Sequence, residues 1–131
     1  MKTSPDFFAI WGGISGIQHG FPLLISDLLK HEVAGLPLLA RVLAANVAQR
    51  FRLPGKGRIA AGHDADFTLL DLESEHVLSN DELLYRHQQG PYAGRKCQVR
   101  VMQTFVRGCP VWADGQMAPD TPKGHFIRPK Q

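Results

Sequence analysis

The sequence predicts an α+β fold in which helices come first and an antiparallel sheet follows. Three observations support this prediction. Apolar residues recur at helical spacing in the first part of the chain, alternation typical of strands follows Leu53, and glycines gather where the pattern changes. With 131 residues, of which 44% are hydrophobic, the chain is long and apolar enough for a packed core. We therefore expect two regions, residues 1–53 and residues 54–131.

The first region is expected to open with a glycine turn and a helix. Gly12, Gly13 and Gly16 form the turn, because glycine adopts backbone angles that other residues avoid. Ile17 to Lys30 is expected to follow as a helix, since its apolar residues lie three and four positions apart.

A second helix is expected after Gly35 and Pro37, which end the first helix and start the next. Its apolar stripe consists of Leu38, Leu39, Val42, Leu43 and Val47. Asn46 is expected to cap a short final turn that ends near Phe51.

The second region is expected to form antiparallel strands. They are predicted at four places: Phe67–Leu72, His76–Leu78, Val99–Arg107 and Pro110–Ala113. Ser79 or Asn80 is expected to cap a brief helix that ends at Leu84. Gly108 turns the chain between the last two strands. The tail beyond Met117 contains three prolines and is expected to lie extended against the surface.

Charge and hydropathy exclude several classes of partner. The net charge is +3, and the densest basic group consists of Arg50, Arg52, Lys56 and Arg58. Because stacking aromatic residues are nearly absent from this group, we interpret it as a solvated connector and expect no nucleic-acid partner. The apolar run from residue 21 to residue 29 is too short to cross a bilayer, and no signal peptide is recognised. We expect no membrane partner and a cytoplasmic location.

The residues that carry chemistry elsewhere do not form a recognisable catalytic pattern here. The six histidines include no His-x-His pair, and Cys97 and Cys109 lack metal-ligand spacing and are expected to be reduced thiols. Gly13 and Ile17 around Ser15 do not complete the pattern of a nucleophile elbow, which needs a glycine two residues before and two residues after the serine. Asp64 and Asp66 are interpreted as turn residues rather than metal ligands. We expect no catalytic residue and no metal ligand in this chain.

Five strings nevertheless match a known family in order along the whole chain. They are IWGGISGIQ (residues 10–18), ANVAQRFRL, KGRIAAGHDADFTLLDL (residues 56–72), LLYRHQQGPYAGR (residues 83–95) and VMQTFVRGCPVWADG with the tail PKGHFIRPK. Together they resemble the C-terminal part of allantoinases and of their dihydroorotase and hydantoinase relatives in the amidohydrolase superfamily. Val47 stands where that family usually has proline.

The resemblance implies a (β/α)8 barrel with a small β-sandwich domain. Residues 1–53 would be the helical end of the barrel, and residues 54–131 would be the C-terminal part of the sandwich. The family's binuclear zinc site, with its carboxylated lysine, histidines and aspartate, would lie upstream of Met1, so this chain is expected to be inactive alone. Trp11, Gly12 and Gly13 would form a loop at the edge of the substrate. The parent reaction would be hydrolysis of a ring amide, with allantoin favoured over dihydroorotate and hydantoins, in purine catabolism.

Two hypotheses about the chain itself remain open. In the first, it contributes scaffold and loop to an amidohydrolase whose barrel lies on the same or a separate chain. In the second, it is a non-catalytic module that associates with copies of itself. Its apolar helix faces and open sheet edges would then be buried in a homo-oligomer.

Overall fold

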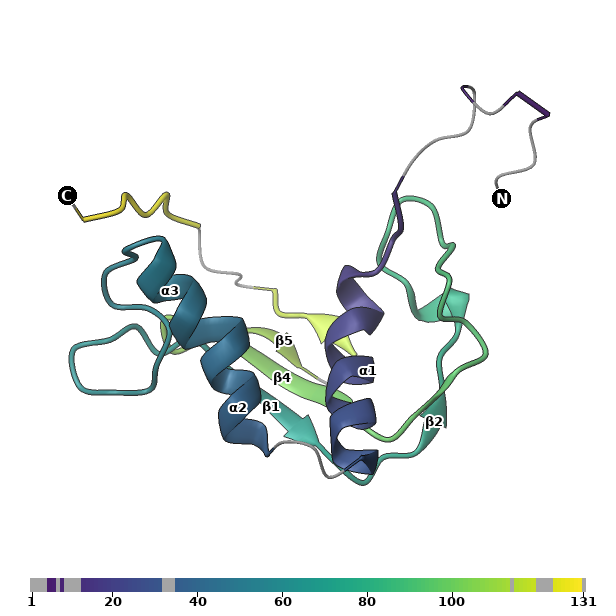
Figure 1. Cartoon of the computed structure of the whole chain (residues 1–131), viewed down its shortest axis with the longest axis horizontal. Coiled ribbons are helices and arrows are strands. Elements are labelled where there is room, and N and C mark those ends of the chain that lie inside the picture. The colour runs from purple at the N-terminus through teal and green to yellow at the C-terminus, as the bar shows by residue number, and fades with distance from the viewer. Residues whose placement is uncertain are drawn as a thin grey trace.

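The computed structural model describes residues 5–6, 8, 13–31, 35–113, 115–119 and 124–130. Helices come first and an antiparallel sheet follows, so the α+β prediction is confirmed (Figure 1). The elements are α1 (Ile17–Lys30), α2 (Leu36–Ala40), η2 (Arg41–Ala45), α3 (Asn46–Arg50), β1 (Phe67–Asp71), β2 (His76–Val77), η3 (Asn80–Glu82), β3 (Lys96–Cys97), β4 (Arg100–Val106), β5 (Cys109–Ala113) and β6 (Gln116–Met117).

The helices occupy the predicted segments, with one correction. α1 has the predicted bounds, and Pro37 lies in the first turn of α2. The segments α2, η2 and α3 run on without a break, η2 being a single π-helical turn. The expected cap at Asn46 is therefore wrong: its backbone is helical at φ −64°, and α3 has no side-chain cap. Where a helix continues, its amides find carbonyl partners one turn back and need no cap.

The main sheet has four strands in the order β1-β4-β5-β6, all antiparallel. Phe67 of β1 lies opposite Phe105 of β4, and their rings stack with centroids 4.6 Å apart. A separate two-stranded ladder pairs β2 with β3. The short strands β3 and β6 were not predicted from the sequence, because two residues carry no detectable alternation.

A tight turn joins β4 to β5, as predicted from Gly108. Both turn residues have left-handed backbone angles, Arg107 with φ 49° and Gly108 with φ 76°. Such angles match the twist of a two-residue hairpin. The turn is held from outside, because the Arg107 amide donates to Asp66 Oδ1 at 2.7 Å and the Gly108 amide donates to the Ala65 carbonyl at 2.9 Å.

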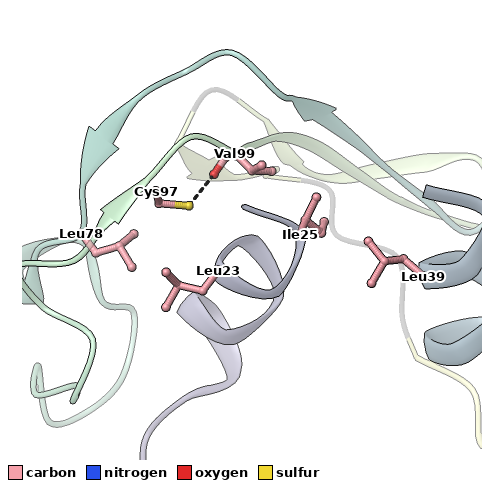
Figure 2. Close-up of a cluster of buried hydrophobic side chains, with 6 residues drawn as sticks. All are labelled: Leu23, Ile25, Leu39, Leu78, Cys97 and Val99. Atoms are coloured by element: carbon pink, nitrogen blue, oxygen red, sulfur yellow. Dashed lines mark hydrogen bonds between the residues drawn. The ribbon is translucent and has the colours of Figure 1, made fainter. Parts of the chain in front are cut away.

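The core lies where α1 meets the second half of the chain. Its buried members are Leu23, Ile25, Leu39, Leu78, Cys97 and Val99. Figure 2 shows these side chains converging from α1, from α2 and from the segments around β3. Ile25 is 1% exposed and Val99 is fully buried. The helical repeat expected from Leu24, Ile25 and Leu28 is only partly right: Ile25 is buried and Leu28 packs against the core, but Leu24 is 41% exposed and Leu23 is buried in its place.

The stripe predicted for the second helix is only partly buried. Leu39 joins the core, while Leu38, Val42, Leu43 and Val47 are exposed. No helix among the described residues is long and apolar enough to cross a membrane.

The described C-terminal segment, residues 124–130, has no regular secondary structure and ends beside α3 (Figure 1). The Lys130 amide donates to the Arg52 carbonyl at 3.0 Å. The described tail thus has no regular structure, as predicted, and it meets the end of α3 at Arg52, while Phe126 is 89% exposed.

Candidate functional site

The glycine turn before α1 is the site that the sequence singled out. Trp11 and Gly12 lie outside the described residues. Gly13 is exposed, with φ 92°, and a Cβ built on it would meet nothing within 4 Å. Its left-handed angle explains why glycine is favoured there. Its contact with a substrate stays a prediction.

The helix that follows this turn receives its N-terminal cap from a distant residue. Gly16, at the capping position of α1, has no side chain to offer. The Gln18 amide instead donates to the Tyr85 hydroxyl at 2.5 Å, across 67 residues of sequence. Because the first amides of a helix lack partners within it, this hydroxyl does the work of a local Ser or Asp cap.

η3 and the loop after it hold the start of α1 through two further hydrogen bonds and lie close to Gly16. The Gln18 side chain donates from Nε2 to the Glu82 carbonyl at 2.7 Å and accepts from the Leu84 amide at 3.0 Å. A Cβ on Gly16 would lie 3.2 Å from the Tyr92 ring. The start of α1 is thus fixed by Glu82 of η3 and by Leu84 and Tyr85, which belong to the segment LLYRHQQGPYAGR. The roles of Gln18 and Tyr85 could not be predicted from the sequence, because no local spacing marks a cap that comes from 67 residues away.

Replacing Tyr85 with phenylalanine is expected to lower the free energy of unfolding by about 1 kcal/mol, the usual loss for one helix cap or hydrogen bond. The Gln18 amide should also exchange with solvent faster, which NMR can measure. Tyr92→Phe is the control, since no hydrogen bond to its hydroxyl is found among the described residues. Equal effects of the two variants would contradict the capping role of Tyr85.

A cavity of about 620 Å³ opens beside the start of α1. It is lined by side chains of α1, η3 and the sheet, among them His19, His76, Glu82, Arg100 and Trp112. His19 is 4% exposed, and neither of its ring nitrogens has a hydrogen-bond partner among the described residues. Burial lowers the pKa of His19 below 6.5; the Glu82 carboxylate opposes this shift and His76 adds to it.

A histidine whose pKa falls on folding costs stability in acid, because the unfolded chain binds the proton more tightly. Stability contributed by neutral His19 should therefore be lost as pH falls through about 6.5. His19→Leu is expected to raise the free energy of unfolding by about 1 kcal/mol, because it removes two unpartnered polar atoms. Urea unfolding at several pH values should show a larger gain in acid. The exposed His87→Leu is the control, and a gain that shrinks as pH falls would contradict this account.

Asp64 and Asp66, in the glycine-rich run, act as turn residues as predicted, and both also pair with a lysine. Lys56 forms ion pairs with Asp64, at 2.8 Å, and with Asp66. Asp66 also accepts from the Arg107 amide in the β4–β5 turn. These carboxylates therefore hold turns together. Across the described ranges, no group of three or more His, Cys, Asp or Glu side chains could hold a metal ion, and Cys97 and Cys109 are free thiols.

Comparison with known proteins shows which proteins this chain is similar to. No protein-family model matches the chain. It is 46% identical over 130 residues to an allantoinase from Deinococcus radiodurans, covering 99% of this chain and 28% of that protein. It is 44% identical over 133 residues to an allantoinase from Rubrobacter xylanophilus, covering 100% of this chain and 29% of that protein. The chain corresponds to part of an amidohydrolase-family protein.

Solved amidohydrolase structures share the fold of this segment. An L-hydantoinase from Arthrobacter aurescens superposes with a TM-score of 0.85 at 24% identity, covering 94% of this chain and 28% of its own. A D-hydantoinase from Thermus sp. superposes with a TM-score of 0.85 at 25% identity, covering 94% of this chain and 27% of its own. This chain thus spans less than a third of the length of the proteins that it matches.

Proposed function

We propose that this chain is the C-terminal part of a metal-dependent cyclic amidohydrolase that hydrolyses a ring amide C–N bond. Allantoin is the favoured substrate, and dihydroorotate and hydantoins are the alternatives. The observation that supports this choice is the 46% identity to an allantoinase across 99% of the chain. The hydantoinases share the fold at lower identity.

Within that enzyme, residues 1–53 would belong to the end of the (β/α)8 barrel and residues 54–131 to the small β-sandwich domain. The element order supports this division, because α1, α2 and α3 precede residue 53 and every strand among the described residues follows residue 66. The loop from residue 53 to residue 66 would then be the crossing between the domains.

The zinc ions that the resemblance implies do not fit the described part of this chain, which offers no cluster of three suitable donors. Their ligands would come from the remainder of the longer protein, and the chain would be inactive alone. Its own contribution would be positional. Trp11, Gly12 and Gly13 would present backbone groups to the substrate's edge, and the Tyr85 hydroxyl and the Gln18 side chain would fix the turn that carries them.

A chimera tests this proposal. The homologous segment of the Deinococcus radiodurans allantoinase is replaced by this chain, and hydrolysis of allantoin, dihydroorotate and hydantoin is measured. We expect allantoin hydrolysis within about tenfold of the parent, since only scaffold and turn contacts change. A chimera that folds and carries the parent's metal content, yet hydrolyses none of the three, would overturn the proposal.

A second function is favoured by one observation, the exposed apolar stripe on α2, η2 and α3. Val42, Leu43 and Val47 are 48%, 42% and 42% exposed. A contiguous apolar face of this kind is typical of an interaction surface. In this alternative, the chain is a non-catalytic module that self-associates through the stripe and its sheet edges. Sedimentation tests it: Leu43→Glu should dissociate the oligomer, and a wild-type chain that is monomeric at micromolar concentration would exclude it.

A further inference from the structure

A second cavity, of about 540 Å³, lies at the C-terminal end of α3. Five basic or imidazole side chains line it: Arg52, Lys56, Arg58, His63 and Lys130. We call it the basic cavity. Its members come from the end of the helix, from the following loop and from the C-terminal tail, which Figure 1 shows beside α3. The sequence alone showed only part of this group, because Lys130 lies far from the others along the chain.

The positive charge of the basic cavity is largely uncompensated. Lys56 is neutralised by Asp64 and Asp66. Across the described residues, no ion pair involves Arg52, Arg58 or Lys130. Three solvent-exposed cations thus line one concave surface without acidic partners, and together they make its potential positive.

The imidazole of His63 adds a second, independent observation. Its Nδ1 atom is buried and has no hydrogen-bond partner among the described residues. Buried polar atoms are nearly always hydrogen-bonded, and this one is not. Because the atom is closed to solvent, an anion in the basic cavity reaches it only if the ring turns toward the cavity.

The backbone conformation of Arg52 is a third observation about the basic cavity. The Leu53 amide donates to the Ala48 carbonyl at 2.8 Å and the Arg52 amide to the Gln49 carbonyl at 3.1 Å, which closes the helix with a Schellman motif. Arg52 occupies the left-handed position of this motif, with φ 52°. Glycine is the favoured residue there, so arginine is present despite a conformational cost. The Lys130 amide binds the Arg52 carbonyl and fixes the tail at the same point.

The helix macrodipole offers a simpler explanation for part of the charge. Cations near the C-terminus of α3 stabilise its negative end. This accounts for Arg50, in the last turn, and for Arg52. It does not account for Arg58 and Lys130, which reach the cavity from a loop and from the tail, or for the unpartnered His63 nitrogen.

We infer that the basic cavity binds a small oxyanion of the phosphate class. Guanidinium groups suit this chemistry, because their planar N–H pairs match two oxygens of one phosphate. The site is separate from the turn before α1, and the inference stands whether or not the proposed amidohydrolase function does.

Calorimetric titration of the full chain with inorganic phosphate and with pyrophosphate, at low ionic strength, tests the inference. Arg58→Gln and Lys130→Gln are each expected to weaken binding about tenfold, the effect of losing one charge-assisted contact. Arg50→Gln is the matched control, since it removes the same charge nearby but does not line the cavity. Thermal unfolding without anion verifies that each variant folds, and Arg58→Lys should retain part of the affinity.

The two probes separate the sources of the anion. Saturable binding of orthophosphate that equals or exceeds that of pyrophosphate supports a site for free phosphate. Tighter binding of pyrophosphate supports the phosphate groups of a larger metabolite. Absence of saturable binding by either probe overturns the inference. An equal loss of affinity with Arg50→Gln, which would reveal only diffuse charge attraction, also overturns it.

Discussion

Replacing Gly57 with alanine is expected to lower the free energy of unfolding by about 2–4 kcal/mol. Gly57 has φ 87°, an angle that alanine adopts only with strain. A Cβ there would also lie 2.6 Å from the Ala48 Cβ and 3.0 Å from the Ala44 carbonyl oxygen. Because these atoms belong to the helix, the loop itself would have to move away. Urea unfolding measures the loss.

Gly62→Ala is the matched control for this prediction. Gly62 lies in the same loop with φ 79°, but a Cβ built on it would meet nothing within 4 Å. Its substitution should therefore cost only the backbone strain, about 1 kcal/mol. If both variants lost the same stability, close approach of the loop to the helix would not be the reason for glycine at position 57.

Replacing Lys56 with methionine is expected to cost about 2 kcal/mol at neutral pH, because two neighbouring carboxylates lose their shared cation. The Lys56 side chain is 17% exposed, so solvent screens its ion pairs with Asp64 and Asp66 only in part. Lys96→Met is the control: its ion pair with Glu75 joins side chains that are 74% and 69% exposed. Exposed pairs contribute little, so unfolding measurements should show almost no change for that variant.

The same cluster should give the wild-type chain a defined pH dependence. Burial opposes ionisation of Asp66, but its bonds to Lys56 and to the Arg107 amide prevail and hold its pKa below 3.8. This contribution is present above pH 3.8 and is lost as pH falls through the lowered pKa. Burial likewise opposes the charge of Lys56, yet its two aspartate partners raise its pKa above 10.5, so its contribution is lost only as pH rises past that value. In Lys56→Met both flanks of the stability profile should flatten. An unchanged acid flank would contradict the role of the Lys56–Asp66 pair.

Regular elements with several periods of pattern could be predicted from the sequence. α1 has the predicted bounds because its apolar spacing runs over almost four turns. β3 and β6 are two residues long and depend on partners elsewhere in the chain, so no local pattern marks them. The cap expected at Asn46 failed for a related reason. Asparagine suits caps, but a continuous helix overrode that preference.

In the candidate sites, too, some features could be predicted from the sequence and others could not. The positive φ of Gly13 could be anticipated from its residue type. The cap from Tyr85 and the arrival of Lys130 beside Arg52 could not, because both depend on contacts between segments far apart in sequence. Lys56 was noticed as one of four neighbouring cations, yet its bonds to Asp64 and Asp66 set it apart from the others.

The loop between residues 53 and 66 is fastened at both ends. Gly57 lies against α3, and Asp66 holds the hairpin turn of the sheet through Arg107. Because the connector contacts both α3 and the hairpin, separation of α3 from the loop would weaken the contacts of the hairpin. Opening of the hairpin would likewise weaken the contacts of α3. We therefore expect α3 and the sheet to unfold as one cooperative unit, so that a destabilising change in either one lowers the order of both.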